Sequence, residues 1–382
     1  MWRLAPFYFG YFANTGVLTT YFPLYLEWRG LSAAQIGIVM AVAQAMRVVG
    51  PTIWGWLADR YVARECILRA TAAAALLAFV PILTPGGFAL VLAVMFVYHF
   101  FLAAQAPMAE AMAGVHLQRR RNAAAQYGRL RAWGSFGFIA LVLAAGPLLD
   151  GLGVALTPYL VVALMALTVA AAWYARDARG REAQAPAVSL RARLREPRVH
   201  WFFVSALLMV FAHGAMYTYL ALYLAHLGYS KAAIGVFWVL GVLLEIGLFF
   251  VQGPLFARYS LFTLLQATLL LAALRFWLTA QFARIVPLLV LAQMLHAATF
   301  ALHHSICVVT IQRWFPGRAA TRGQALYISI GYGIGGTAGS LAAAGLWSSL
   351  GPAGTFGASA LAALAGWGAA RVARRHERPS EI

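Results

Sequence analysis

The sequence predicts an all-α membrane protein in which twelve transmembrane helices form two pseudo-symmetric six-helix bundles. Of the 382 residues, 63% are hydrophobic and only 10% are charged, whereas an ordinary soluble domain carries about 25% charged residues. Twelve apolar runs follow one another along the chain, each near the length of about 20 residues that a helix needs to cross a bilayer. A stretch of the first half also recurs in the second. The composition excludes a water-soluble globular protein and a disordered one.

The apolar runs are bounded by charged residues or by Gly/Pro clusters. We expect helices in all of them, because backbone polar groups in lipid must be satisfied internally, and because the runs are too long and too uniform for β-barrel strands. The first run follows Arg3 directly and shows no small-residue cleavage site, so it is read as a spanning helix rather than a removable signal. The runs lie at residues 5–26, 34–57, 66–84, 88–111, 127–149, 155–175, 201–226, 233–256, 260–281, 286–311, 323–346 and 353–371.

The basic residues predict the orientation of the chain. Twelve spans place both termini on one side, and that side holds 23 Arg and Lys residues, whereas the opposite side holds Arg29, Lys231 and Arg284. The positive-inside rule then places both termini in the cytoplasm, and we expect the membrane to be a bacterial inner membrane. The net charge of +18 is explained by this orientation and by contact with anionic headgroups, so it does not indicate nucleic-acid binding.

The chain divides near its middle. We expect an N-terminal bundle at 1–175, a cytoplasmic linker at 176–200, a C-terminal bundle at 201–372 and a cytoplasmic tail at 373–382. Within the linker, the basic run Leu190–Arg195 could form a short surface helix. The segment Thr20-Tyr-Phe-Pro-Leu-Tyr-Leu26 recurs as Thr218-Tyr-Leu-Ala-Leu-Tyr-Leu224, and the offset of 198 continues to Gly253 and Arg258. Two parallel halves of this kind are typical of transporters, with a binding site near the midplane.

One loop carries a family resemblance. The segment Gly55-Trp-Leu-Ala-Asp59-Arg60-Tyr61 resembles the cytoplasmic loop motif of the major facilitator superfamily, although Val62 stands where the motif has its second glycine. The resemblance implies the major facilitator fold and assigns Gly55, Asp59 and Arg60 to a cytoplasmic gate.

Further segments of the chain resemble two groups within that superfamily. Pro107-Met-Ala-Glu110 and Gln126–Gly134 resemble lactose-permease-like proton symporters, in which the residues matching Glu110 and Arg131 bind sugar. The His/Glu pair of those symporters is missing, because Thr299 follows His296 at the spacing where a glutamate would stand. The segments Ala45–Gly50, Leu295–Phe300 and Gly323–Tyr327 look closer to the phenylpropionate permease group, which implies an aromatic carboxylate as substrate.

Five charged residues fall inside the runs: Arg47, Glu110, Arg131, Glu245 and Arg275. Each costs at least about 2.5–3.5 kcal/mol at a helix centre, so each is expected to face a partner or a water-filled path. Arg47 and Glu245 share the offset of 198 and lie roughly 20 Å from their helix ends, near the midplane. The resemblance implies that the fifth and eighth helices meet across the two halves, so we expect Arg131 and Glu245 to face each other at similar depth, as a fixed salt bridge or as a switchable pair. Arg275 is expected to snorkel or to form a structural pair.

Histidines and polar residues complete the candidate site. His296 lies at the repeat offset from Tyr98, and histidine titrates near neutral pH as a proton carrier must. A histidine that merely hydrogen-bonds a neighbouring helix is the alternative. By elimination, Glu245 or His296 is expected to carry the coupled proton. The candidates for substrate binding or proton coupling are Arg131, Glu245, Glu110, Arg47, His296, His213, Tyr98 and Asn14.

These observations predict a secondary transporter that moves a small organic solute, an aromatic or other organic carboxylate, by proton symport through alternating access. Two alternatives stay open. One is an efflux antiporter, because Gly146-Pro147 partly matches the Gly-Pro motif of drug/proton antiporters. The other is a symporter for a sugar or a nucleoside. No phosphate loop, nucleophile elbow or zinc helix is present, so we expect no enzyme, cofactor or metal. Cys66 and Cys307 give no metal spacing. The expected partners are the solute, protons and the lipid bilayer, with no nucleic acid, and the expected state is a monomer.

The predicted topology is tested by labelling single cysteines in intact cells. A cysteine replacing Ala183 is expected to resist an impermeant maleimide, because the linker would face the cytoplasm, whereas one replacing Thr84 is expected to react. Labelling of the residue-183 variant from outside would overturn the orientation.

Overall fold

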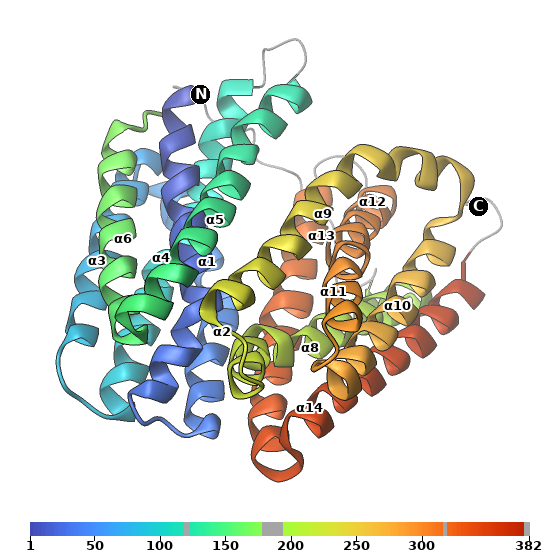
Figure 1. The fold of residues 1–382 in the computed structure, drawn as a ribbon. Coiled ribbons are helices and arrows are strands. Elements are labelled where there is room, and N and C mark those ends of the chain that lie inside the picture. Colours follow the sequence, from blue (N-terminus) through green and yellow to red (C-terminus); the bar gives the residue numbers. More distant parts are fainter. Residues whose placement is uncertain (118–122, 178–193, 316–318, 378–382) are drawn as a thin grey trace. The chain divides into compact units, whose positions relative to one another are not determined.

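A computed structural model describes residues 1–117, 123–177, 194–315 and 319–377, and the regular elements in these ranges are helices (Figure 1). Each apolar run of the sequence falls on a helix, which confirms the all-helical fold. The first half contains η1 (Trp2–Leu4), α1 (Ala5–Trp28), α2 (Ala33–Arg60), α3 (Arg64–Phe79), η2 (Val80–Leu83), α4 (Phe88–Leu117), α5 (Ala123–Leu152), η3 (Val154–Leu156) and α6 (Thr157–Tyr174). The second contains α8 (Pro197–His226), α9 (Lys231–Arg258), α10 (Leu261–Phe282), α11 (Val286–Met294), η4 (Ala297–Leu302), α12 (His303–Trp314), α13 (Ala319–Tyr327), η5 (Ile328–Gly335) and α14 (Gly336–Arg375). The segments η4 and η5 are π-helical.

Ten helical segments in the described part of the chain are long and apolar enough to cross a membrane. One of them, Arg322–Arg375, has 54 residues, far more than a single crossing requires. It is interrupted at Gly351, where φ is 68° and ψ is −172°, a left-handed conformation that favours glycine. The 24-residue helix α1 is not among the ten segments. The ten apolar segments make the chain an integral membrane protein.

The chain forms two compact units. Unit 1 contains Met1–Ala183 and Leu224–Val239, and unit 2 contains Gln184–Tyr223 and Leu240–Ile382. Helices α8 and α9 therefore each pass from one unit into the other. Most of the expected linker (178–193), including the start of its basic run, and the end of the expected tail (378–382) lie outside the described residues.

Helix α1 is the centre of unit 1. It packs against α5 and α6, while α3 packs against α4 and α6, and α2 packs against α4. Its side chains are buried around most of its circumference, including Phe7, Tyr21 and Phe22. A helix that is apolar all round belongs inside a bundle, which explains why this helix has no polar face.

The internal repeat recurs in the packing. A methyl group added at Gly335 would lie 2.6 Å from the carbonyl oxygen of Leu207, and one added at Gly137 would meet the carbonyl oxygen of Phe9. Both members of the first contact follow those of the second by 198 residues. Each unit therefore contains the same backbone-to-backbone approach at a glycine, as expected for two halves built on one plan.

Alanine at Gly335 or Gly137 is expected to destabilise the protein by about 1–3 kcal/mol, because the new methyl group overpacks the contact. Alanine at Gly345, which meets no atom within 4 Å, is expected to be neutral or stabilising, because alanine favours a helix over glycine by about 1 kcal/mol. Thermal unfolding in detergent measures the difference. Equal melting temperatures for the Gly335→Ala and Gly345→Ala variants would show that the contact is loose.

Candidate functional site

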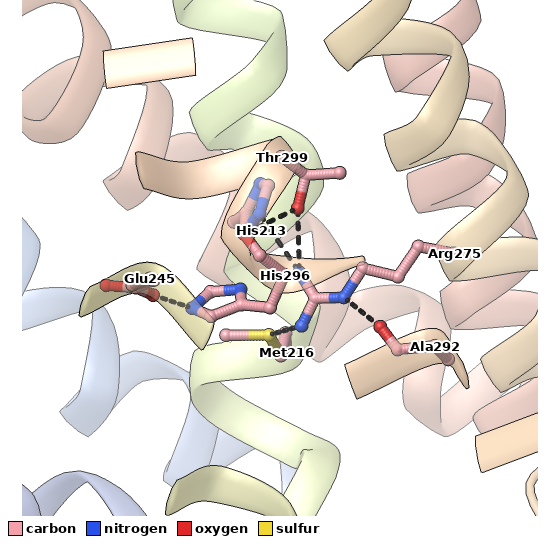
Figure 2. Close-up of polar contacts among 7 residues, drawn as sticks. All are labelled: His213, Met216, Glu245, Arg275, Ala292, His296 and Thr299. Carbon is pink, nitrogen blue, oxygen red and sulfur yellow. Dashed lines mark hydrogen bonds and ion pairs between the residues drawn. The ribbon is translucent and has the colours of Figure 1, made fainter. Parts of the chain in front are cut away.

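A buried arginine organises the interior of unit 2. The side chain of Arg275 extends from α10, and only 1% of the residue is exposed. Its Nε donates to the carbonyl oxygen of Ala292 at 3.0 Å, and Nη1 reaches Nε2 of His213 at 3.2 Å and the hydroxyl of Thr299 at 3.3 Å. Nη2 lies against the sulfur of Met216. Figure 2 shows the guanidinium enclosed by these groups from α8, α11 and η4.

The contacts of His213 fix its protonation state. Its Nδ1 lies 2.8 Å from the carbonyl oxygen of Met209, which only accepts, so Nδ1 carries a hydrogen. Its Nε2 faces the guanidinium of Arg275, which only donates, so Nε2 carries none. His213 is therefore a neutral acceptor with one defined tautomer.

Arg275 consequently keeps its full charge. All its hydrogen-bond partners are neutral. The carboxylate of Glu245, which pairs with His296, also acts on Arg275 electrostatically. The hydroxyl of Thr299 donates to the carbonyl oxygen of His296 at 3.3 Å and accepts from Arg275. The protein thus solvates the buried cation with neutral groups and places one carboxylate nearby.

A titratable pair lies beside this cation. Nε2 of His296 lies 2.8 Å from Oε1 of Glu245, with 8% and 16% of the two side chains exposed. The rings of His296 and His213 are 6.0 Å apart. The sequence predicted both Glu245 and His296 as candidate proton carriers, and the structure joins them by one hydrogen bond (Figure 2).

Local backbone features hold this pair. An added methyl group at Gly241 of α9 would lie 3.0 Å from the ring of His296, so glycine allows the ring to approach α9. His296 directly precedes the π-helix η4, and Phe300 within η4 stacks on its ring at 5.3 Å and 15°. Phe300 also packs edge-on against Tyr217 and Tyr332. An aromatic cluster therefore adjoins the charged groups.

Five predicted residues of unit 1 lie on α1 or near it. Asn14 donates to the hydroxyl of Tyr98 at 2.7 Å, and both residues are buried. The guanidinium carbon of Arg131 lies 3.9 Å from the ring centroid of Phe12. Glu110 is close enough to Arg131 for the two charges to interact. Arg47 acts electrostatically on the Tyr11 ring of the same region, as do Glu110 and Arg131.

The remaining predictions have different outcomes. Gly55 and Arg60 lie in the last turns of α2, and Arg60 stacks over Trp56 at 5.9 Å, while the side chain of Asp59 lies outside what the structure describes. Arg131 belongs to unit 1 and Glu245 to unit 2, so their pairing stays a prediction.

Sequence reasoning left two readings of Arg275 open, snorkelling and a structural pair, and did not identify its hydrogen-bond partners. Snorkelling is wrong for this residue, because its side chain is fully buried. The available signal was the spacing of its partners: His213 and Met216, and His296 and Thr299, each lie three residues apart and so share a helix face. In the described part of the chain no group of three or more His, Cys, Asp or Glu residues could hold a metal ion.

Comparison with known proteins places this chain in a family. The model of the MFS_1 like family matches residues 1–358. The chain is 28% identical over 341 residues to a probable 3-phenylpropionic acid transporter of Escherichia coli (strain K12), covering 86% of each protein. It is 25% identical to a maltose permease of Geobacillus stearothermophilus, covering 86% of this chain and 83% of that one. Among solved structures, the nucleoside transporter NupG matches with a TM-score of 0.85 at 16% identity, covering 98% of this chain and 99% of that one.

Replacing Arg275 by lysine is expected to destabilise the protein by about 2 kcal/mol or more, because an ammonium group cannot reproduce the planar fork of donors. This corresponds to a fall of roughly 2–3 °C or more in the melting temperature. Lysine at the exposed Arg284 is the control, and we expect no change there. An unchanged melting temperature of the Arg275→Lys variant in detergent would contradict the network.

Proposed function

Because the chain belongs to the MFS_1 like family, we propose that it is a proton symporter that takes up an aromatic or other organic carboxylate by alternating access. Family membership itself makes it a major facilitator secondary transporter of a small solute, and not an enzyme. The observation that carries the proposal is the buried Arg275, hydrogen-bonded to neutral groups, beside the Glu245–His296 pair.

The buried cation favours an anionic substrate. Two unit charges roughly 8 Å apart attract by about 2 kcal/mol at an effective dielectric constant of 20, so a substrate carboxylate need not touch Arg275 to be stabilised by it. The aromatic cluster around Phe300 offers ring faces and edges of the kind that aromatic groups pack against. A carboxylate on an aromatic skeleton matches both features.

The Glu245–His296 pair supports coupling to protons. The two groups share one hydrogen bond, so they titrate as a unit rather than separately. A proton on this pair and an anion bound nearby stabilise each other, and that coupling is reciprocal. Binding of the anion therefore promotes loading of the proton, as symport requires.

The charge balance makes a further demand on the transport cycle. Arg275 keeps its positive charge throughout, and only the pair exchanges a proton. If one proton travels with one monovalent anion, no net charge crosses the membrane. Uptake would then respond to the pH gradient and not to the membrane potential.

The relatives favour a carboxylate as the substrate and name one competitor. The relative from Escherichia coli is described as a probable transporter of 3-phenylpropionic acid, which is an aromatic carboxylic acid. The relative from Geobacillus stearothermophilus is a maltose permease, so a sugar is the second candidate substrate. Proton-coupled efflux remains the alternative direction.

We also infer the membrane arrangement that this function needs. Ten spanning segments, the separate helix α1 and the division of Arg322–Arg375 at Gly351 would together give twelve crossings. Both termini would then lie in the cytoplasm of a bacterial inner membrane, with bundles at 1–175 and 201–372, and the protein would act as a monomer. The predicted gate at Gly55, Asp59 and Arg60 belongs to the same proposal.

The test is uptake of labelled 3-phenylpropionate into proteoliposomes that are acidic outside. The unaltered protein is expected to accumulate the acid uphill, with alkalinisation of the external medium. Glu245→Gln is expected to abolish accumulation yet retain counterflow exchange, because exchange needs no net movement of protons. Glu65→Gln, a change of a carboxylate in the first turn of α3, is the matched control and should accumulate normally.

Three results would contradict the proposal. Uphill accumulation by both Glu245→Gln and His296→Gln with an unchanged pH dependence would remove the pair from coupling. External acidification on adding the acid would indicate antiport. Uptake of maltose but not of 3-phenylpropionate would show that the substrate is a sugar and not a carboxylate.

A further inference from the structure

The hairpin between α8 and α9 is fastened to the first half of the chain. Residues Leu224–Val239 follow the repeat pattern of the second half, yet they cluster with unit 1. Nε2 of His226 lies 2.7 Å from Oε1 of Glu27. The other contacts are made by side chains of α1 and α5, which bind the first turn of α9.

Asp150, at the end of α5, binds the backbone of α9 directly. Its Oδ1 accepts from the backbone N–H of Lys231 at 2.9 Å, and its Oδ2 accepts from the backbone N–H of Ala232 at 2.9 Å. These are the first two N–H groups of the helix, which have no partner within it. A carboxylate is also favoured at the positive end of the helix dipole. The side chain of Lys231 contributes a looser contact of 3.5 Å.

The repeat shows that this contact is specific to the second half. At the start of α2, Ser32 and Gln35 form a complete capping box. At the start of α9, Ser230 occupies the position of Ser32 and binds the N–H of Ala233, but alanine stands where Gln35 would be. The cap of α9 is therefore completed by a residue of another helix.

Tyr21 and two glycines bring the helices into close contact. The hydroxyl of Tyr21 lies 2.8 Å from the carbonyl oxygen of Val142 on α5 and 3.2 Å from that of Lys231. A methyl group at Gly146 would lie 2.7 Å from the Cα of Ala232, and one at Gly235 would meet the hydroxyl of Tyr21. Helices α1 and α5 therefore contact the start of α9 through backbone atoms and a tyrosine hydroxyl.

We propose that Asp150 and Tyr21 form a releasable clamp on the first turn of α9, and that the clamp opens during the transport cycle. Helix α9 passes from unit 1 into unit 2, where it carries Glu245 about 21 Å beyond Lys231. Any displacement of the units must therefore bend α9 or free its first turn. Asp150 and Lys231 are about one-third exposed, so water can replace their hydrogen bonds when the turn leaves. The proposal rests on alternating access but not on the substrate or the coupled ion.

The test is thiol labelling at Val142, which is fully buried and lies beside Gly235. The Val142→Cys variant, in a Cys66→Ser background, is treated with N-ethylmaleimide without substrate, and labelling is measured site by site by mass spectrometry. Adding Asp150→Asn is expected to speed labelling at position 142 at least ten-fold, because the amide places a donor against one backbone N–H. The natural Cys307, buried in unit 2, should stay protected.

Two changes at Lys231 separate the backbone contact from the ion pair. Lys231→Gln removes only the ammonium group and is expected to change the labelling rate less than two-fold. Lys231→Pro also removes one backbone donor, while proline suits the first position of a helix, and it is expected to speed labelling as Asp150→Asn does.

The outcomes that overturn the clamp are distinct. An unchanged rate at position 142 in the Asp150→Asn variant would make the contact static. Equal acceleration at Cys307 would indicate general loosening of the fold. Equal effects of Lys231→Gln and Asp150→Asn would assign the contact to the ion pair. None of these results depends on whether 3-phenylpropionate or protons are transported.

Discussion

The central constraint in unit 2 is that a guanidinium buried inside a membrane protein must have its donors satisfied. Arg275 meets this constraint with groups from α8, α11 and η4, so three segments must converge on one side chain of α10. The same requirement selects the tautomer of His213 and orients the hydroxyl of Thr299. Because every acceptor is neutral, the positive charge is stabilised locally and still acts on whatever enters the region.

This arrangement separates two tasks that a single ion pair would combine. A carboxylate bound directly to Arg275 would cancel its field, and moving a proton would then require breaking a buried ion pair, which is expensive. In the proposed function, a permanent charge and an exchangeable proton reside on neighbouring but different groups. The proposal then has the Glu245–His296 pair change its protonation while the cation and its ligands stay in place.

The sequence predicted much of this molecule because its strongest signals are physical necessities of a bilayer. The lengths of the apolar runs located the helices, and the offset of 198 found in the sequence recurs in the contacts at Gly137 and Gly335. The cost of intramembrane charge singled out Glu245. The contact of Glu245 with His296 was less accessible to sequence reasoning, which suggested Arg131 from the family resemblance and from depth. The hydrogen bond to His296 depends on how α9 and η4 meet at Gly241.

Other features leave no simple pattern in one sequence. The assignment of Leu224–Val239 to unit 1 depends on contacts between helices that are distant in the sequence. Asp150 follows a Gly-Pro pair, and nothing in its sequence context marks it as a partner of α9. For Arg275 the snorkelling alternative was wrong, because its distance from Arg284 suggested access to the surface. Residue spacing specifies which side chains share a helix face, but it does not specify which faces become neighbours.

The π-helices η4 and η5 have a mechanical consequence. A π turn accommodates one extra residue through i→i+5 hydrogen bonds, so it behaves as a dislocation in an otherwise regular helix. A dislocation can migrate by one residue by exchanging a single hydrogen bond. Each step reorients one side chain by roughly 100° about the axis, the angular increment of an α-helix, while both ends of the helix remain anchored. Phe300, inside η4 and stacked on His296, is placed where such a step would turn an aromatic ring without displacing a whole helix.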